Sequence, residues 1–301
     1  YILRKAGWDT HGLPVEIEVE KKLGLKDKTD VENYGIDKFN DECKQSVFSY
    51  ESAWVKLSER IGFWLDMEYP YITLKNDYIE SVWWSLKQAW EKKLLYKGHK
   101  VVPYCPRCGT ALSAHEVAQG YKTVEDPSIY VKFKLKDEDA FFLAWTTTPW
   151  TLLSNVALAV HPDELYIKIR YHGQVMILAE ERASVLLKGQ QYELIDGYKG
   201  KELAGIKYDP LFSYANPNKK AWYIITADFV TMEDGTGIVH IAPAFGEDDY
   251  NVGKENDLPV VQLVNLDGSF KDEVTDWKGE FVKDADPKII KHLEDQGLLE
   301  G

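Results

Sequence analysis

The sequence predicts an α/β (α+β) fold in which a helix-rich region precedes a mixed, barrel-like β domain. Residues 1–125 carry apolar side chains at helical spacing, whereas residues 126–301 carry short apolar runs separated by Gly, Pro and Asp. Charge divides at the same point, because residues 1–125 hold 18 Lys/Arg against 19 Asp/Glu and residues 126–301 hold 18 against 30. We therefore predict two domains, at 1–125 and 126–301.

The composition is typical of a soluble globular protein, with 45% hydrophobic and 28% charged residues among 301. No apolar run approaches the roughly 20 residues that span a bilayer, so no membrane partner is expected. Three cysteines indicate a reducing compartment, and we expect a cytoplasmic protein. The net charge of −13 disfavours general phosphate binding, so any nucleic acid must be held locally or by parts outside this chain. The first residue is Tyr1 rather than Met, and we expect an excised fragment of a longer protein.

Residues 1–24 predict the end of a strand, a loop at 7–14 and a helix at 15–23. A loop that follows a strand and leads into a helix is where an α/β sheet places ligand contacts. Asp9 and His11 lie in this loop, either as capping residues or as groups that carry chemistry. Two amphipathic helices follow, over residues 36–65 and after Asp77. Their apolar faces comprise Phe39, Cys43, Val47, Tyr50, Trp54, Leu57 and Ile61, then Ile79, Val82, Trp83, Leu86 and Trp90.

A Cys-x-x-Cys turn at Cys105 and Cys108 has the spacing of a zinc knuckle. Two thiolates two residues apart can reach one metal ion, but tetrahedral zinc needs four ligands. His115 is either a third ligand or a surface residue, and a second pair of ligands would have to lie beyond residue 301. A redox dithiol is the competing interpretation, although no thioredoxin-like pattern surrounds the turn.

Beyond residue 126 the sequence predicts short strands with a few helices, as in a mixed, barrel-like β domain. The predicted strands are Ser128–Leu135, Ala140–Trp145, Val156–Val160, Leu165–Arg170, Val175–Leu178, Tyr223–Ala227, Gly237–Ala242 and Val260–Val264. Helices are predicted at Glu180–Leu187 and Asp286–Leu298.

One candidate site segment is Trp145–Thr151, where a strand is stopped by Pro149. Three consecutive hydroxyls put side chains on both faces of the strand, so at least one faces any cleft at its end; they belong to Thr146, Thr147 and Thr148. The alternative is that these β-branched residues are simply good strand formers. Trp145 and Trp150 would wall an apolar pocket.

The second candidate segment is Gly235–Tyr250, a glycine-bounded turn followed by an apolar strand and three carboxylates. His240 on the strand is either a satisfied core histidine or a substrate contact. The acidic run of Glu247, Asp248 and Asp249 is either the solvated start of a helix or part of a site.

Together the two segments contain the groups needed to hydrolyse an activated ester. Asp249 can hold an ammonium group, while threonine hydroxyls and backbone amides can position water and bind a developing oxyanion. His240 can orient the substrate or move a proton. Attack by positioned water on an activated ester asks little of a protein beyond placement.

These motifs closely resemble the isoleucyl branch of the class I aminoacyl-tRNA synthetases over essentially the whole chain. The matching segments are Gly7–Glu16, Pro103–Thr110, Thr146–Thr151 and Gly235–Tyr250. Valyl and leucyl relatives carry Arg where this chain has Trp150. The two ATP-handling signatures of the family, HIGH and KMSKS, are absent. The resemblance implies part of a Rossmann-type synthetic domain in residues 1–125, with an inserted editing domain, connective peptide 1, from about 126 to 298.

The implied activity is editing, the hydrolysis of valine wrongly attached to the isoleucine tRNA. By motif, Thr146, Thr147 and Thr148 would line the terminal adenosine and the scissile ester. Trp150 would shape the pocket, His240 would contact the aminoacyl group, and Asp249 would bind the valine ammonium.

The resemblance also implies roles outside the editing segments. Asp9, with Trp8 beside it, would lie near the isoleucine ammonium of the synthetic site, and Cys105 and Cys108 would form half of a zinc site. ATP and Mg²⁺ would be used only by the full-length ligase, and tRNA(Ile) would be the macromolecular partner. The alternative function is a non-catalytic module that binds tRNA.

Overall fold

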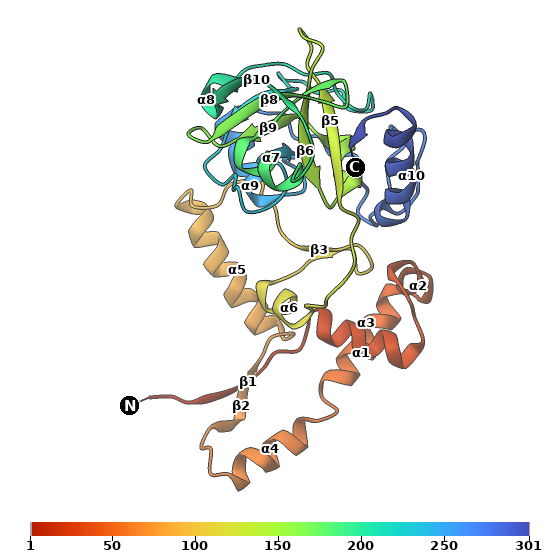
Figure 1. The fold of residues 1–301 in the computed structure, drawn as a ribbon. Helices are drawn as coiled ribbons and strands as arrows, with labels where there is room; N and C mark the ends of the chain where they lie inside the picture. The colour runs from red at the N-terminus through yellow and green to blue at the C-terminus, as the bar shows by residue number, and fades with distance from the viewer. Residues whose placement is uncertain (1, 301) are drawn as a thin grey trace. The chain divides into compact units, whose positions relative to one another are not determined.

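The computed structural model describes residues 2–300, which divide into two compact units (Figure 1). The first unit takes the chain through His99, together with Arg107–Gly109, and the second takes Lys100–Pro106 and the chain from Thr110 onward. The units divide ahead of the predicted domain boundary at residue 125. Pro106 already belongs with the second unit, since a Cβ added to Gly268 would lie 3.1 Å from the Pro106 Cβ.

The first unit combines five helices with a short parallel strand pair in the part of the chain that is described. Its elements are β1 (Lys5–Trp8), α1 (Leu13–Leu23), α2 (Lys28–Tyr34), α3 (Ile36–Val47), α4 (Glu51–Arg60), β2 (Asp66–Ile72) and α5 (Asn76–Glu91). Trp8 pairs with Ile72, so both strands end at the same edge. The predicted strand–loop–helix at the start is therefore present as β1, a loop and α1.

The single helix predicted over residues 36–65 is wrong, because the chain breaks between α3 and α4. Residues 47–50 are Val-Phe-Ser-Tyr, all weaker helix formers than Ala, Leu or Lys. Ser49 also turns its hydroxyl back to the Gln45 carbonyl at 3.4 Å, which competes with continued helix. The predicted apolar stripe is buried only at its start, since Phe39 is 5% exposed whereas Trp54 is 57% exposed.

The second unit is built on a curled sheet that the described residues form from nine strands (Figure 1). The strand order is β10-β8-β9-β6-β12-β7-β11, with β5 pairing β6 and β13 pairing β5. The strands are β5 (Ile129–Lys134), β6 (Phe141–Thr146), β7 (Ala157–Val160), β8 (Leu165–Tyr171), β9 (Gln174–Ala179), β10 (Glu193–Lys199), β11 (Tyr223–Thr226), β12 (Ile238–Ile241) and β13 (Leu299–Glu300). Parallel and antiparallel pairs both occur, which confirms the predicted mixed α/β class with a barrel-like sheet.

Short helices and one hairpin complete the second unit. They are β3 (Tyr104–Cys105), β4 (Thr110–Ala111), α6 (Ala114–Gln119), the 3₁₀ helix η1 (Pro149–Ser154), α7 (Glu180–Leu186), α8 (Gly200–Leu203), α9 (Glu247–Glu255) and α10 (Val282–Asp295). Strand and helix side chains share one large core that includes Phe133, Phe142, Leu158 and Ile289. Among residues 2–300, no helix is long and apolar enough to cross a membrane.

Two segments of the second unit differ from the predicted strands. Val260–Val264 forms no strand and makes only an isolated bridge from Val264 to Phe270, although Val261 and Leu263 pack into the core. The strand β10 was not predicted. It lies at the end of the sheet, and its mostly exposed side chains give it no apolar alternation to detect.

Candidate functional site

The two candidate segments lie on neighbouring strands of the second unit. β6 runs parallel to β12, with Val239 opposite Trp145. Parallel strands end at the same edge of a sheet, so the threonine-rich peptide and the segment after His240 leave the sheet side by side. This pairing joins residues that are about ninety positions apart in the chain.

A chain of hydroxyl groups links the threonine-rich peptide to His240. Thr146 Oγ1 lies 3.3 Å from Thr148 Oγ1, which lies 3.0 Å from Thr151 Oγ1, which lies 3.0 Å from His240 Nε2. The Thr148 amide also donates to Thr146 Oγ1 at 3.1 Å. Thr147 is half-buried between its neighbours.

The hydrogen bonds around Thr151 assign a tautomer to His240. Thr151 has one hydroxyl proton and donates it to the Thr148 carbonyl at 2.8 Å. With that proton directed to the Thr148 carbonyl, Thr151 Oγ1 accepts from His240, and we assign the hydrogen to Nε2 and leave Nδ1 as the bare acceptor. Among the described residues Nδ1 has no hydrogen-bond partner, and burial lowers the pKa of His240 to about 4. The imidazole is accordingly neutral at physiological pH.

Asp249 is folded back onto the end of β12. It occupies the first turn of α9, and its Oδ1 accepts the Ala242 amide at 2.7 Å. Burial raises the pKa of Asp249, and the Ala242 amide partly offsets that rise. Gly246 makes the approach possible, since a Cβ there would lie 2.1 Å from Asp249 Oδ2. Glu247 and Asp248 are exposed at the start of the helix, where the helix dipole stabilises negatively charged side chains.

Aromatic contact joins the two segments a second time. The Trp150 and Phe245 rings meet edge to face, with centroids 4.8 Å apart. Such pairs favour a fixed geometry beyond their apolar burial. Trp150 Nε1 is buried without a hydrogen-bond partner among the described residues.

Sequence reasoning missed two polar residues of this site. Thr151 lay within the quoted peptide, and its spacing of three from Thr148 was the available signal for a shared turn. Asp286 was predicted only as the start of a helix, whereas α10 begins at Val282 and buries Asp286. Its Oδ1 accepts the Trp150 amide at 2.9 Å.

The site predicted around Asp9 and Trp8 lies in the first unit. Trp8 ends β1 and Asp9 follows it, at the edge where β2 also ends. Thr73 Oγ1 lies 3.5 Å from Asp9 Oδ1 and accepts the Thr10 amide at 3.0 Å. Asp9 is therefore at the carboxyl end of a parallel strand pair, a usual position for ligand contacts in α/β sheets.

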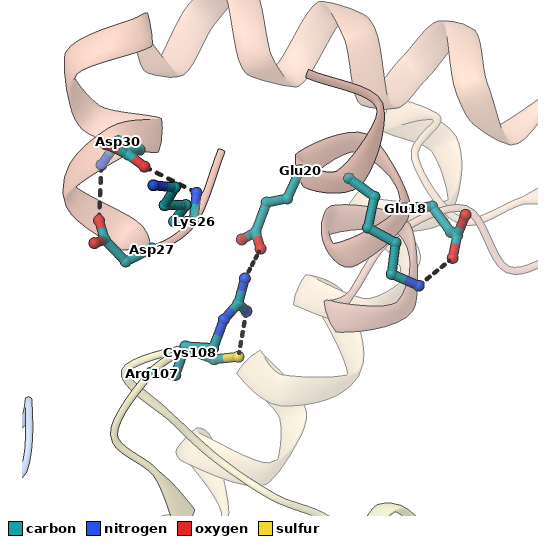
Figure 2. A network of polar contacts seen from close by, with 8 residues as sticks. Glu18, Glu20, Lys26, Asp27, Asp30, Arg107 and Cys108 are labelled. Atoms are coloured by element: carbon teal, nitrogen blue, oxygen red, sulfur yellow. Dashed lines mark hydrogen bonds and ion pairs between the residues drawn. The ribbon is translucent and has the colours of Figure 1, made fainter. Parts of the chain in front are cut away.

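The Cys-x-x-Cys turn connects β3 to β4. Arg107 lies between the two cysteines and donates to Cys108 Sγ at 3.5 Å and to Glu20 Oε2 at 2.9 Å (Figure 2). Within residues 2–300 no group of three or more His, Cys, Asp or Glu side chains could hold a metal ion. Tetrahedral zinc needs four ligands, so a zinc site at Cys105 and Cys108 stays a prediction.

Comparison with known proteins gives sequence relatives over almost the whole chain. The isoleucine–tRNA ligase of Clostridium acetobutylicum is 60% identical over 297 residues, which cover 98% of this chain and 28% of the ligase. The isoleucine–tRNA ligase of Clostridium novyi is 58% identical over 299 residues, covering 99% of this chain and 29% of the ligase. The chain therefore spans less than a third of the length of these relatives.

The crystal structure of GlLeuRS-CP1 aligns with 58% of this chain and with 98% of its own, at 15% identity and a TM-score of 0.48. A family model for tRNA synthetases class I (I, L, M and V) matches residues 1–254. With the identities to isoleucine–tRNA ligases, this match confirms the resemblance that the motifs indicated. The chain belongs to the class I tRNA synthetases of the I, L, M and V group.

Proposed function

We propose that the chain is part of an isoleucine–tRNA ligase, and that its second unit hydrolyses valine from mischarged tRNA(Ile). The observation that carries this proposal is the hydroxyl chain from Thr146 through Thr148 and Thr151 to His240, together with the half-buried carboxylate of Asp249 at the end of β12. Hydroxyls, a neutral imidazole and an ammonium-holding carboxylate are the groups that an aminoacyl ester needs.

In the proposed reaction, water attacks the carbonyl carbon of the valine ester. The bond from that carbon to the ribose oxygen breaks, this oxygen takes up a proton from the attacking water, and free valine and an intact tRNA end are released. Asp249 holds the valine ammonium, whose charge would lower the raised pKa of this carboxyl again. Threonine hydroxyls orient the ester and the water. His240 acts as a neutral hydrogen-bonding group, because its pKa of about 4 leaves it uncharged.

Editing is needed because valine and isoleucine differ by one methylene. That group is worth only about 1–3 kcal/mol in an apolar pocket, a magnitude already familiar from this enzyme family rather than one inferred from this structure. A second site that admits valine and excludes isoleucine by size supplies the missing discrimination. Trp150, packed on Phe245, would set that size limit.

The whole ligase would have a synthetic activity as well as the editing activity proposed here. The ligase would join isoleucine to tRNA(Ile) with ATP and Mg²⁺ in the cytoplasm, with Asp9 and Trp8 near the isoleucine ammonium. Cys105 and Cys108 would hold zinc as two of four ligands, and the metal would rigidify the turn that carries Arg107.

Deacylation of valyl-tRNA(Ile) by the 301-residue chain tests the proposed activity. We expect hydrolysis faster than in buffer, and an Asp249→Ala variant slowed at least about a hundredfold because the ammonium loses its partner. The far-ultraviolet circular dichroism of that variant should match the wild type. An ester that is no less stable with the chain than without it would refute the activity.

Gly246 offers a test that leaves the carboxylate in place. A Gly246→Ala methyl would meet Asp249 Oδ2, so the carboxylate must rotate away and deacylation should fall about tenfold or more. The matched control is Gly197→Ala in β10, whose methyl would meet nothing closer than 3.9 Å. Equal rates for the two variants would show that the position of Asp249 is unimportant.

A further inference from the structure

The buried face of α10 contains one carboxylate among apolar side chains. Asp286 is 3% exposed, and the other buried residues of the helix are Val282, Ala285, Ile289 and Leu293. A carboxylate in such a position is costly unless it is paired or hydrogen-bonded. Its Oδ1 accepts the Trp150 amide at 2.9 Å, and among the described residues its Oδ2 has no partner.

The Trp150 amide is a donor that the local helix cannot satisfy. η1 begins at Pro149, which has no amide hydrogen, and the first amides of any helix lack partners within it. The Thr151 amide already turns back to the Thr148 carbonyl at 3.0 Å. Trp150 therefore carries the amide that needs an acceptor from elsewhere.

The usual acceptor would be the side chain that precedes the helix. Thr148 holds the N-cap position of η1, and threonine is a favoured cap. Yet Thr148 makes no capping bond, because its hydroxyl lies against Thr146 Oγ1 and Thr151 Oγ1 instead. The Thr148 hydroxyl thus lies in the chain to His240, and the Trp150 amide is accepted by Asp286 instead.

We propose that Asp286 is a positioning residue that caps η1 from α10 and so frees the Thr148 hydroxyl for the chain that leads to His240. The inference rests on the proposed editing function for its effect on rate, but the capping itself can be measured without substrate. The carboxyl oxygen of Asp286 accepts the Trp150 amide, which the threonine side chain at the N-cap would otherwise accept.

Substitutions at Asp286 separate the acceptor from the charge. Asp286→Asn keeps an oxygen of the same shape, whereas Asp286→Ala removes it. Asp286→Leu also removes it but suits the apolar face of α10, so that at least one variant without an acceptor keeps its helix packed. Asp284→Ala, on the exposed face of the same helix, is the control for loss of one charge.

The kinetic readout is deacylation of valyl-tRNA(Ile) by the 301-residue chain. We expect kcat to fall at least about tenfold in the Ala and Leu variants, with KM within about threefold of wild type, because the ester is bound but poorly oriented. The Asn and Asp284→Ala variants should stay within about threefold of the wild-type kcat. A wild-type kcat in both the Ala and Leu variants would overturn the proposal, as would an Asn variant as slow as they are.

The second readout follows the capped amide directly and needs no activity. In chain labelled with ¹⁵N-tryptophan, hydrogen exchange of the Trp150 amide should accelerate at least about tenfold in the Ala and Leu variants and stay slow in the Asn variant. The amides of the other tryptophans in the second unit serve as internal controls for global unfolding. If the wild-type chain lacks deacylase activity, the proposed function fails while this exchange measurement still decides the capping. An amide equally protected in all variants would refute it.

Discussion

Among single residues, His240 is a neutral hydrogen-bond donor that stays uncharged well below physiological pH. Its Nε2 hydrogen is directed to Thr151. Burial alone explains its lowered pKa. A histidine in this state can fix a hydroxyl or accept a hydrogen bond at Nδ1, but it is a weak base at neutral pH. In the proposed hydrolysis, placement of the ester would therefore matter more than proton abstraction.

The lowered pKa of His240 makes the stability of the fold depend on pH in a defined window. In the unfolded chain this histidine takes up a proton near pH 6.5, whereas in the folded chain it does so only near pH 4. Stability is therefore full above about pH 6.5 and is lost as pH falls toward 4, by about 3 kcal/mol from this residue. Asp249 and Asp286 have raised pKa values and act in the opposite direction, so a variant is needed to isolate His240.

His240→Gln keeps a nitrogen donor within reach of Thr151 but does not titrate. We expect urea denaturation between pH 7 and pH 4 to show a smaller loss of unfolding free energy for this variant, by about 2–3 kcal/mol. Deacylation at pH 7.5 should remain within about tenfold of wild type, because the donor is retained. Parallel pH profiles for the two proteins would contradict the assignment of a buried neutral imidazole.

Among the elements, β12 follows directly after the Gly235-Thr236-Gly237 turn and lies beside β6 in the sheet. Gly237 has a φ of +73°, and a Cβ there would lie 2.5 Å from the Ala179 Cβ. Tyr166 also donates to the Gly237 carbonyl at 2.7 Å, so this backbone cannot move away freely. Both the dihedral angle and the contact require glycine at this position.

Gly237→Ala should therefore destabilise the fold more than the same change at a free glycine. Gly279→Ala is the matched control, since it has the same φ of +73° and no atom within 4 Å of an added Cβ. We expect a loss of about 1–2 kcal/mol at Gly279 from the dihedral angle alone, and about 1–3 kcal/mol more at Gly237 from overpacking. The measurement is chemical denaturation followed by tryptophan fluorescence, and equal losses would exclude the packing term.

The elements of the second unit could be predicted from the sequence where their apolar patterns were strong. β5, β6, β8 and β9 follow from alternation or apolar runs, whereas the exposed edge strand β10 has neither. The candidate site was predictable in part, because Thr146, His240 and Asp249 belong to recognisable motifs. Asp286 was not, since its partner Trp150 lies 136 positions away and only the packing of α10 brings them together.

At the scale of the whole molecule, burial is concentrated in the second unit. Its main core includes Val131 of β5 and Leu293 of α10, whereas the buried apolar side chains among the described residues of the first unit are few: Ala6, Val19, Phe39 and Ile72. The first unit also exposes large side chains on α4 and α5, among them Trp54, Trp83 and Trp90. Because apolar burial is the main stabilising contribution, the two units of this chain should differ in local stability.

Hydrogen–deuterium exchange read by mass spectrometry tests this difference on the intact 301-residue chain. Peptides that contain β6 and β12 should remain protected at least about a hundredfold longer than peptides from α4 and α5, whose helices bury little apolar surface. The order should persist in low urea, where the first unit opens before the second. If α4 and α5 exchange as slowly as the sheet, the first unit is stabilised by something other than the apolar burial described for it, and the contrast in stability is wrong.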